Sequence, residues 1–243
     1  MLGGSLGGSM VDPAAFRNYL LSLSPLSMWA LDETSGTAAV DYGSLGNNGV
    51  YQTNSALAQP SLLPNKYGGS AYFNGALTPV PYVEIPTSAS YDTGTLTILL
   101  LFQNNTNRAN GSIINWRDAS NTEGFSLQGA GTGNGVTMKV WDTAYKDVNV
   151  AAANGTPYLI ICRVDGSNSK VAITDLSAGT TATNSTACGN MLAPNSSPKV
   201  RIGMQSTFTP GMGADTYVQL ATWIGSAISD AQVADIQRLA KQL

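Results

Sequence analysis

The sequence predicts an all-β fold, an antiparallel two-sheet β-sandwich with a short helix near the N-terminus and another at the C-terminus. Charged residues make up only 11% of the 243 residues, whereas glycines number 26, which favours short strands joined by polar turns. Short apolar segments with a two-residue period recur between Gly, Asn and Asp. Helical periodicity is confined to two segments, 12–23 and 229–243.

Composition also limits the class of partner. A chain of this length forms a sizeable core, and all-β sandwiches of this size are commonly one domain. The net charge is −3, and no cluster of Lys and Arg offers the basic surface that nucleic-acid binding needs. No apolar run is long enough to span a bilayer, and the N-terminus lacks the pattern of a secretory signal. We therefore expect neither nucleic acid nor membrane as a partner, and synthesis in the cytoplasm.

Residues 1–11 form a glycine-rich N-terminal arm, and residues 12–243 form the folded domain. The composition of the arm is that of a flexible linker. Its sizeable apolar side chains are few, and we expect them to attach the protein to a preformed apolar surface, since burial of each contributes about 1.5 to 3 kcal/mol. These attachment residues are Leu2, Leu6, Met10 and Val11. The alternative is that the arm folds back onto its own domain.

A short helix follows the arm. Asp12 supplies an N-cap and Pro13 occupies the first helical position. We expect this helix to reach about Leu23 and to pack over one end of the sandwich. Its apolar residues at helical spacing are Phe16, Tyr19, Leu20 and Leu23.

Residues 27–49 predict the opening of the sandwich. They indicate a short strand with Trp29, an acidic turn at 32–33, a second strand at 38–40 and a polar loop that ends at Gly49. Residues 50–64 contain two prolines and no regular period, so we expect them to be irregular.

The middle of the chain predicts a series of strands. Two of them, 95–103 and 158–164, are apolar on both faces, so their outward residues Leu99, Leu101, Leu159 and Ile161 should be covered by the chain itself or by a neighbour. The other expected strands are 70–73, 82–85, 112–116, 125–128, 136–141, 147–150 and 170–176.

The C-terminal part predicts strands at 200–203 and 217–225, after a polar connection at 180–197. Ser229 and Gln232 form a capping box at the start of the last helix. Val233, Ile236, Leu239 and Leu243 give this helix one apolar stripe.

Catalytic residues are scarce. The chain has no histidine, which removes the usual Ser and Cys hydrolase sites and most zinc sites. Glycoside hydrolysis needs a pair of carboxylates, but the three glutamates, Glu33, Glu84 and Glu123, are far apart in the sequence. We therefore expect no enzymatic activity.

Several segments together resemble the laminin-G-like, concanavalin A-like lectin/glucanase jelly-roll superfamily. They are SMWALDETSGTAAVDYGSLGNNG (27–49), YGGSAYFNG (67–75), YVEIP (82–86), VRIG (200–203) and the closing helix. The resemblance extends over roughly 19–242. It implies a jelly roll, but the Glu-x-Asp-x-x-Glu triplet of the related glucanases is missing here.

The resemblance also implies a metal site, and the tryptophans suggest a second kind of site. Members often hold a structural Ca²⁺, and Asp41, Asn47 and Asn48 match an Asp/Asn-rich loop of the family, although Asx residues in tight turns usually bond their own backbone. Gln219 replaces an Asp that often binds this metal. Trp116 and Trp141 are either core residues or a platform for a glycan.

Cys162 and Cys188 are either bridged or two buried free thiols.

Because the fold hosts many functions, function has to be argued from the surface. Tailed-phage particles use modules of this family, so the first hypothesis is a virion structural protein at the virion surface, a capsid decoration or head-fibre protein. Its partners would be the major capsid protein or neighbouring copies in a homo-oligomer or symmetric array. The second hypothesis is a non-catalytic carbohydrate-binding, lectin-like module of a fibre or cell-surface protein, with a glycan as partner.

Overall fold

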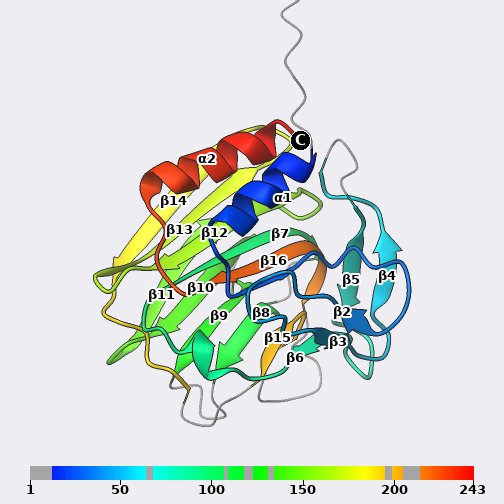
Figure 1. Ribbon diagram of the computed structural model, residues 1–243, viewed down its shortest axis with the longest axis horizontal. Coiled ribbons are helices and arrows are strands. Elements are labelled where there is room, and N and C mark those ends of the chain that lie inside the picture. The colour runs from blue at the N-terminus through cyan, green and yellow to red at the C-terminus, as the bar shows by residue number, and fades with distance from the viewer. Residues whose placement is uncertain are drawn as a thin grey trace, which may run out of the picture.

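Two antiparallel β-sheets pack face to face, and two helices lie together on the outside of one of them (Figure 1). The computed structural model describes residues 13–63, 68–106, 109–117, 123–130, 134–194, 199–204 and 214–243. This is the two-sheet sandwich with a helix near each end that the sequence predicts.

Sheet A carries the two doubly apolar strands at its centre. The short strand β1 (Ser27–Trp29) pairs with β16 beside the main path of the sheet. Along that path the strands are β14 (Thr181–Ala187), β13 (Asn168–Asp175), β12 (Tyr158–Val164), β7 (Leu96–Thr106), β16 (Asp215–Ile224), β5 (Ser70–Asn74) and β4 (Ala56–Gln59).

Sheet B packs against sheet A and is built from shorter strands. In spatial order they are β11 (Tyr145–Ala151), β10 (Gly135–Trp141), β9 (Gly124–Gly129), β8 (Ser112–Arg117), β15 (Val200–Ile202), β6 (Val83–Ile85), β3 (Gly49–Tyr51) and β2 (Ala38–Ala39). A single turn of 3₁₀-helix, η1 (Ala89–Tyr91), follows β6.

The main core lies between the sheets and centres on aromatic residues. Trp223 of β16 meets Trp116 of β8 edge to face, with ring centroids 5.3 Å apart, and Tyr91 of η1 at 4.8 Å. Trp29 of β1 is also fully buried there. Edge-to-face aromatic pairs add stability beyond the area that they bury.

A second apolar cluster covers the outer face of sheet A. Helices α1 (Pro13–Ser22) and α2 (Asp230–Lys241) pack on this face, and Figure 1 shows them side by side. The cluster confirms that the outward residues of β7 and β12 are covered, here by the chain's own helices. Those four residues, each at most 1% exposed, are Leu99, Leu101, Leu159 and Ile161.

The termini of α2 are as predicted. Ser229 and Gln232 form the capping box, and Val233, Ile236 and Leu243 are buried. Neither of the helices in the described parts of the chain is long and apolar enough to cross a membrane.

Three local expectations were wrong. Helix α1 lies on the outer face of sheet A, not over one end of the sandwich, because β7 and β16 present apolar residues on that face. The connection at 180–197 contains β14, and the irregular stretch at 50–64 contains β4 and part of β3. Strands β14 and β4 lie at the edges of sheet A with mostly exposed or half-buried residues, so they lack the apolar alternation by which strands are recognised.

Candidate functional site

The outer face of sheet B contrasts with that of sheet A. On β10 the residues Val136, Met138 and Val140 point into the core, so Thr137, Lys139 and Trp141 point outward. The same alternation turns polar residues outward on the neighbouring strands. This face therefore carries polar and aromatic side chains, which are buried on β8 and β9 and become exposed toward the edge strand β11, where the candidate site lies.

Strand pairing aligns six of these outward residues in one row across the sheet, which we call the polar row. Each member lies directly opposite the next on the neighbouring strand. The row runs, from β11 to β6, through Asp147, Lys139, Ser126, Asn115, Arg201 and Glu84. It thus has an oppositely charged pair of residues at each end and two small polar residues in its middle.

The two ends of the row differ in how their charges are paired. At the β6 end, the Glu84 carboxylate accepts a hydrogen bond at 3.0 Å from Arg201 and a second, charge-assisted one from Lys199. The Arg201 guanidinium also lies 4.9 Å from the ring centroid of Tyr82. Burial raises the pKa of Glu84, but these two hydrogen bonds outweigh it and lower the pKa below its usual value.

At the β11 end, Lys139 interacts with an aromatic ring rather than with a carboxylate. Its ammonium nitrogen lies 4.8 Å from the ring centroid of Tyr145. The Tyr145 hydroxyl bonds to Asp147, and burial together with this bond raises the pKa of Tyr145. Within the described residues no carboxylate oxygen lies within 4.0 Å of the Lys139 nitrogen. Burial and the nearby Arg117 guanidinium lower the pKa of Lys139, which Asp147 only partly opposes.

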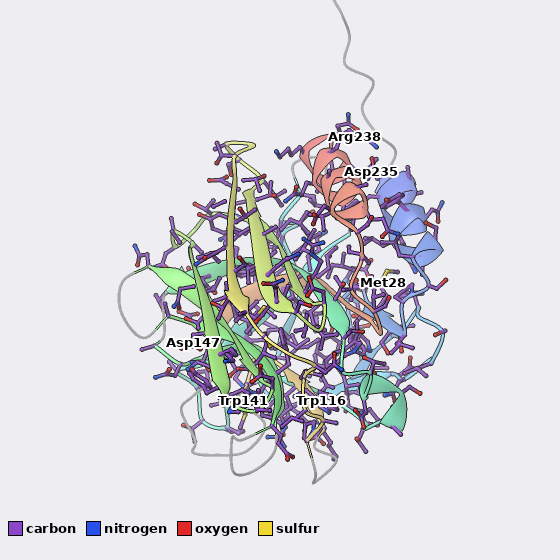
Figure 2. The ribbon with its side chains drawn as sticks, turned by 90° about the vertical axis from the view of Figure 1, so that its left-hand side faces the viewer. Met28, Trp116, Trp141, Asp147, Asp235 and Arg238 are labelled. Carbon is purple, nitrogen blue, oxygen red and sulfur yellow. The ribbon has the colours of Figure 1, made fainter. Side chains whose placement is uncertain are left out.

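A second pair of residues adjoins Lys139. The Arg117 guanidinium lies 5.0 Å from the ring centroid of Trp141, and the Trp141 ring is tilted against Tyr145 with centroids 5.1 Å apart. We call the group Arg117, Lys139, Trp141, Tyr145 and Asp147 the Lys139 cluster. In Figure 2, Asp147 and Trp141 lie well away from α2, which carries Asp235 and Arg238.

Exposure within the Lys139 cluster is uneven. Tyr145 is 44% exposed, whereas Trp141 is 7% exposed and Arg117 is buried. Tyr145 and Asn149 on the edge strand β11 are therefore the parts that a ligand from solvent meets first. Further in, Ser126 is fully buried and its hydroxyl has no hydrogen-bond partner.

The two carboxylates of the polar row, Glu84 and Asp147, are too far apart for paired acid catalysis. Glu84 and Asp147 are separated by five strand spacings, which at about 4.8 Å each is roughly 24 Å, far beyond the reach of a hydrolytic pair. A general acid also needs a raised pKa, whereas the pKa of Glu84 is lowered. Glu33 lies elsewhere and accepts hydrogen bonds from Val40 N and the Tyr51 hydroxyl.

The structure separates the two tryptophans of the expected glycan platform. Trp116 is 3% exposed and packs in the core against Trp223, so it presents no ring face to a sugar. Its orientation follows from a bulge at Ile113, which reverses the alternation of β8 after Ser112. Trp141 is on the outer face of sheet B, but it is nearly buried beside Arg117 and Tyr145.

The expected calcium ligands lie together in one loop but are engaged by the chain itself. The Asp41 carboxylate accepts hydrogen bonds from Met28 N, Gly43 N and Asn47 N at 2.7 to 2.8 Å. Asn48 Oδ1 accepts the Asp41 N–H. No group of three or more acidic, Cys or His residues that could hold a metal occurs in the described parts of the chain. The sequence left two interpretations of this loop, a calcium site and an Asx turn that bonds its own backbone. The structure shows the Asx turn, and calcium binding stays a prediction.

Gln219 also has a structural role. It lies at a bulge of β16, and its side-chain oxygen accepts the Leu62 N–H at 2.7 Å. In the sequence Gln219 is notable only as a departure from a metal-binding pattern. In the structure it anchors the loop that contains Leu62, beside sheet A.

Both cysteines are buried free thiols. Cys162 pairs with Val171 on β13, whereas the Cys188 N–H bonds to Ser167 O, which precedes β13 and lies four residues before Val171. The separation along the strand explains why they are not bridged.

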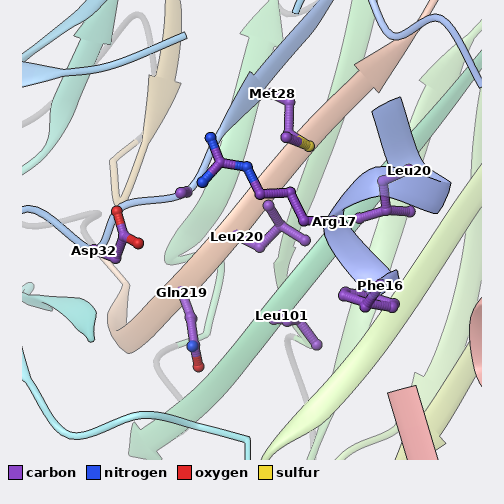
Figure 3. Close-up of a pocket in the computed structure, with 9 residues that line it drawn as sticks. Phe16, Arg17, Leu20, Met28, Asp32, Leu101, Gln219 and Leu220 are labelled. Atoms are coloured by element: carbon purple, nitrogen blue, oxygen red, sulfur yellow. The ribbon is translucent and has the colours of Figure 1, made fainter. Parts of the chain in front are cut away.

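Two hollows outside sheet B are less suited to a ligand. The one between α1 and sheet A, shown in Figure 3, is apolar and holds about 10 Å³, which is room for at most a single water. A more open hollow of about 390 Å³ lies beside α2, but its Arg163 and Lys170 are already paired with Asp230 and Asp165.

The attachment residues Leu2, Leu6, Met10 and Val11 lie outside the described residues.

No protein-family model and no curated protein sequence matches the chain. Solved structures do match its fold. One is domain 4 of AbnA, a GH43 extracellular arabinanase from Geobacillus stearothermophilus, in complex with arabinotriose; the TM-score is 0.65 at 12% identity over 89% of this chain and 98% of that domain.

Binding domains of botulinum neurotoxins match as well. The binding domain of botulinum neurotoxin DC in complex with SialylT has a TM-score of 0.62 at 10% identity, covering 89% of this chain and 52% of that one. The HCR/D W1238A mutant has a TM-score of 0.64 at 9% identity over the same shares. The chain thus spans about half the length of these domains. The matches show the fold alone, a two-sheet β-sandwich of jelly-roll type as the sequence predicts, and none of those described here is a virion protein.

The residues of the Lys139 cluster other than Trp141 were missed by sequence reasoning. The alternation of Thr137, Lys139 and Trp141 with Val136, Met138 and Val140 was visible in the sequence and marks one polar face. What the sequence does not contain is the register that brings Asp147 opposite Lys139 and places Arg117 near Trp141.

Proposed function

We propose that the chain is a non-catalytic carbohydrate-binding, lectin-like module, and that its sugar binds on the outer face of sheet B at the Lys139 cluster. The observation that carries this proposal is the contrast between the two outer faces. Sheet A is covered by helices over an apolar cluster, whereas the outer face of sheet B carries polar side chains, which are buried on β8 and β9 but end in an exposed tyrosine, Tyr145, on the edge strand β11. The fold likeness to a domain in complex with arabinotriose supports the proposal.

The chemistry of the Lys139 cluster suits a sugar. The exposed ring of Tyr145 offers an apolar surface for the C–H face of a pyranose or furanose ring. Asp147 and Asn149 on the same strand supply an acceptor and an amide for hydroxyl groups. Each such hydrogen bond contributes about 0.5 to 1.5 kcal/mol net, so a short oligosaccharide would bind in the micromolar to millimolar range.

Isothermal titration with a panel of neutral and acidic oligosaccharides tests this function. Tyr145→Ala should weaken the binding of any sugar that the wild type takes by about fivefold or more, since an aromatic contact is worth about 1 kcal/mol or more. Tyr42→Ala is the matched control, because Tyr42 is 39% exposed and also carries a cation, Arg17, over its ring at 3.7 Å, but lies near α1. Equal losses in both variants, or no sugar bound at all, would refute the proposal.

The virion hypothesis remains a separate proposal, resting on the composition of the arm. Deleting residues 1–11 tests it. If the arm attaches the protein, the truncated domain should keep its melting temperature and lose co-sedimentation with particles. Unchanged binding to particles would contradict the role of the arm, and a large drop in melting temperature would support the alternative that the arm folds back onto the domain.

A further inference from the structure

The edge strands of the two sheets, β11 and β14, lie beside each other on one side of the sandwich. Among the described strands, β11 pairs with β10 alone and β14 pairs with β13 alone. The outer edge of such a strand presents backbone N–H and C=O groups that no further strand engages. Because β11 also carries the exposed residues of the candidate site, the way in which this edge is held bears on the proposed function.

Two side chains of β14 bridge the gap between the edges. Asn184 Nδ2 donates a hydrogen bond at 2.8 Å to the backbone oxygen of Asn149, and Thr186 Oγ1 donates one at 3.1 Å to that of Asp147. Asn184 Oδ1 also accepts the N–H of Ser185 on its own strand at 2.8 Å. We call Asn184 and Thr186 the edge clasp. The edge clasp thus bonds to backbone groups of both edge strands.

Resting on the proposed function, we infer that Asn184 and Thr186 are positioning residues of the sugar site. Through the backbone of β11 they hold Asp147 and Asn149, and with them the exposed ring of Tyr145, in one arrangement before the sugar arrives. They act through β11 rather than on the sugar itself.

Asn149 shows how closely the strand is held. Its side-chain Oδ1 accepts a hydrogen bond from Thr137 of β10, and its backbone oxygen accepts the one from Asn184. Although Asn149 is exposed, its side chain is therefore bonded to sheet B and its backbone to sheet A. A residue fixed in this way has less conformational freedom to lose when a ligand binds.

The edge clasp affects affinity through the local opening of β11. Strands at the edge of a sheet open more readily than those at its centre. A ligand that binds only the closed arrangement loses affinity in proportion to the fraction of molecules that are open. One hydrogen bond of ordinary net strength changes such an opening equilibrium by about threefold to tenfold.

The test removes the two donors separately and together. Thr186→Val replaces the hydroxyl by a methyl group of similar size, whereas Thr186→Ser keeps the hydroxyl. Asn184→Asp keeps the oxygen that accepts the neighbouring N–H and loses the donor to Asn149. Thr183→Val is the matched control, because Thr183 lies three positions from Thr186 on the same strand and so on the opposite face of the sheet.

Two measurements are compared in each full-length variant, well below its melting temperature. Hydrogen exchange of the β11 amides reports local opening. Isothermal titration reports the affinity for the sugar that the wild type binds most tightly among arabino-, xylo-, galacto- and galacturono-trisaccharides. Thr186→Val and Asn184→Asp should each speed exchange in β11 by about threefold to tenfold, and the double variant should bind the sugar about threefold or more weakly. Thr186→Ser and Thr183→Val should match the wild type in both measurements.

The outcomes separate this inference from the proposed function. A purely structural role would lower the melting temperature without changing the affinity of the folded protein. Faster exchange with unchanged sugar binding therefore refutes the positioning role and leaves the lectin-like module standing. Unchanged exchange in Thr186→Val and Asn184→Asp, or equal weakening of the sugar by Thr183→Val, also refutes it. If no trisaccharide binds to the wild type, the proposed function itself is refuted, and the positioning role with it.

Discussion

The guanidinium of Arg117 and the ring of Trp141 approach to 5.0 Å across a residue that has no side chain. That residue is Gly124, which lies opposite Arg117 on β9 and one position beyond the pair of Phe125 and Val140. A Cβ at Gly124 would come within 2.1 Å of the Trp116 carbonyl oxygen, and its φ of +99° is one that other residues rarely adopt. The backbone beside this contact therefore requires glycine at position 124.

Gly124→Ala should lower the free energy of unfolding by more than about 2 kcal/mol and change the fluorescence of Trp141, because strain and a backbone clash act together. The matched control is Gly155→Ala. Gly155 has a φ of +73° but no atom within 4 Å of a Cβ, so it should lose only about 1 kcal/mol. Denaturant unfolding of the two variants measures the difference, and equal losses would contradict the role of the clash.

Glu84→Gln should make the protein less stable at pH 7 by about 1 kcal/mol, the upper end of the range for ion pairs near the surface. Because the folded-state pKa of Glu84 lies below its ordinary value of 4.5, its stabilising effect is fully present above pH 4.5 and is lost as the pH falls through the folded value. The difference between wild type and variant should therefore close in acid. Unfolding curves from pH 7 to pH 3 check this, and a gap that is constant or grows in acid would contradict it.

Leu20→Ala should lower the free energy of unfolding by about 2 to 5 kcal/mol, since Leu20 of α1 is fully buried against sheet A. Asn18→Ala on the same helix is exposed and should stay within about 0.5 kcal/mol of the wild type. Thermal and denaturant unfolding measure both. If Leu20→Ala were as stable as Asn18→Ala, α1 would not be the cover that sheet A requires.

Cys162 and Cys188 should resist a thiol reagent in the native protein and react only on unfolding. Burial raises the pKa of both thiols, so the reactive thiolate is scarce even at pH 8. Colorimetric thiol titration with and without denaturant measures this. A reductant should leave the melting temperature unchanged, because the structure has no bridge between them; a fall in melting temperature with reductant would overturn that assignment.

The sequence predicts those structural features that follow from a local pattern of residues and misses those that depend on strand pairing. The apolar residues on both faces of 95–103 and 158–164 predicted a cover over sheet A, because Leu99 and Leu159 would otherwise contact water. Strand β14 was missed because its sequence, TATNSTA, has no apolar alternation. It is held in the sheet by backbone pairing with β13.

The candidate site was harder to predict for the same reason. The polar row joins six strands whose order in the sheet is not their order in the chain, so its charge pairs exist only once the register is known. Trp116 and Trp141 look alike in sequence, and a single bulge residue, Ile113, sets the side of the sheet on which Trp116 lies.

Helices α1 and α2 contact each other on the outer face of sheet A, where the Tyr19 hydroxyl donates a hydrogen bond to Asp235. Residue 13 and residue 243 therefore both lie on the side of the molecule opposite to the polar row (Figures 1 and 2). A protein fused at either of these points, or a bead or sensor surface coupled there, would orient every copy with sheet B directed into solution.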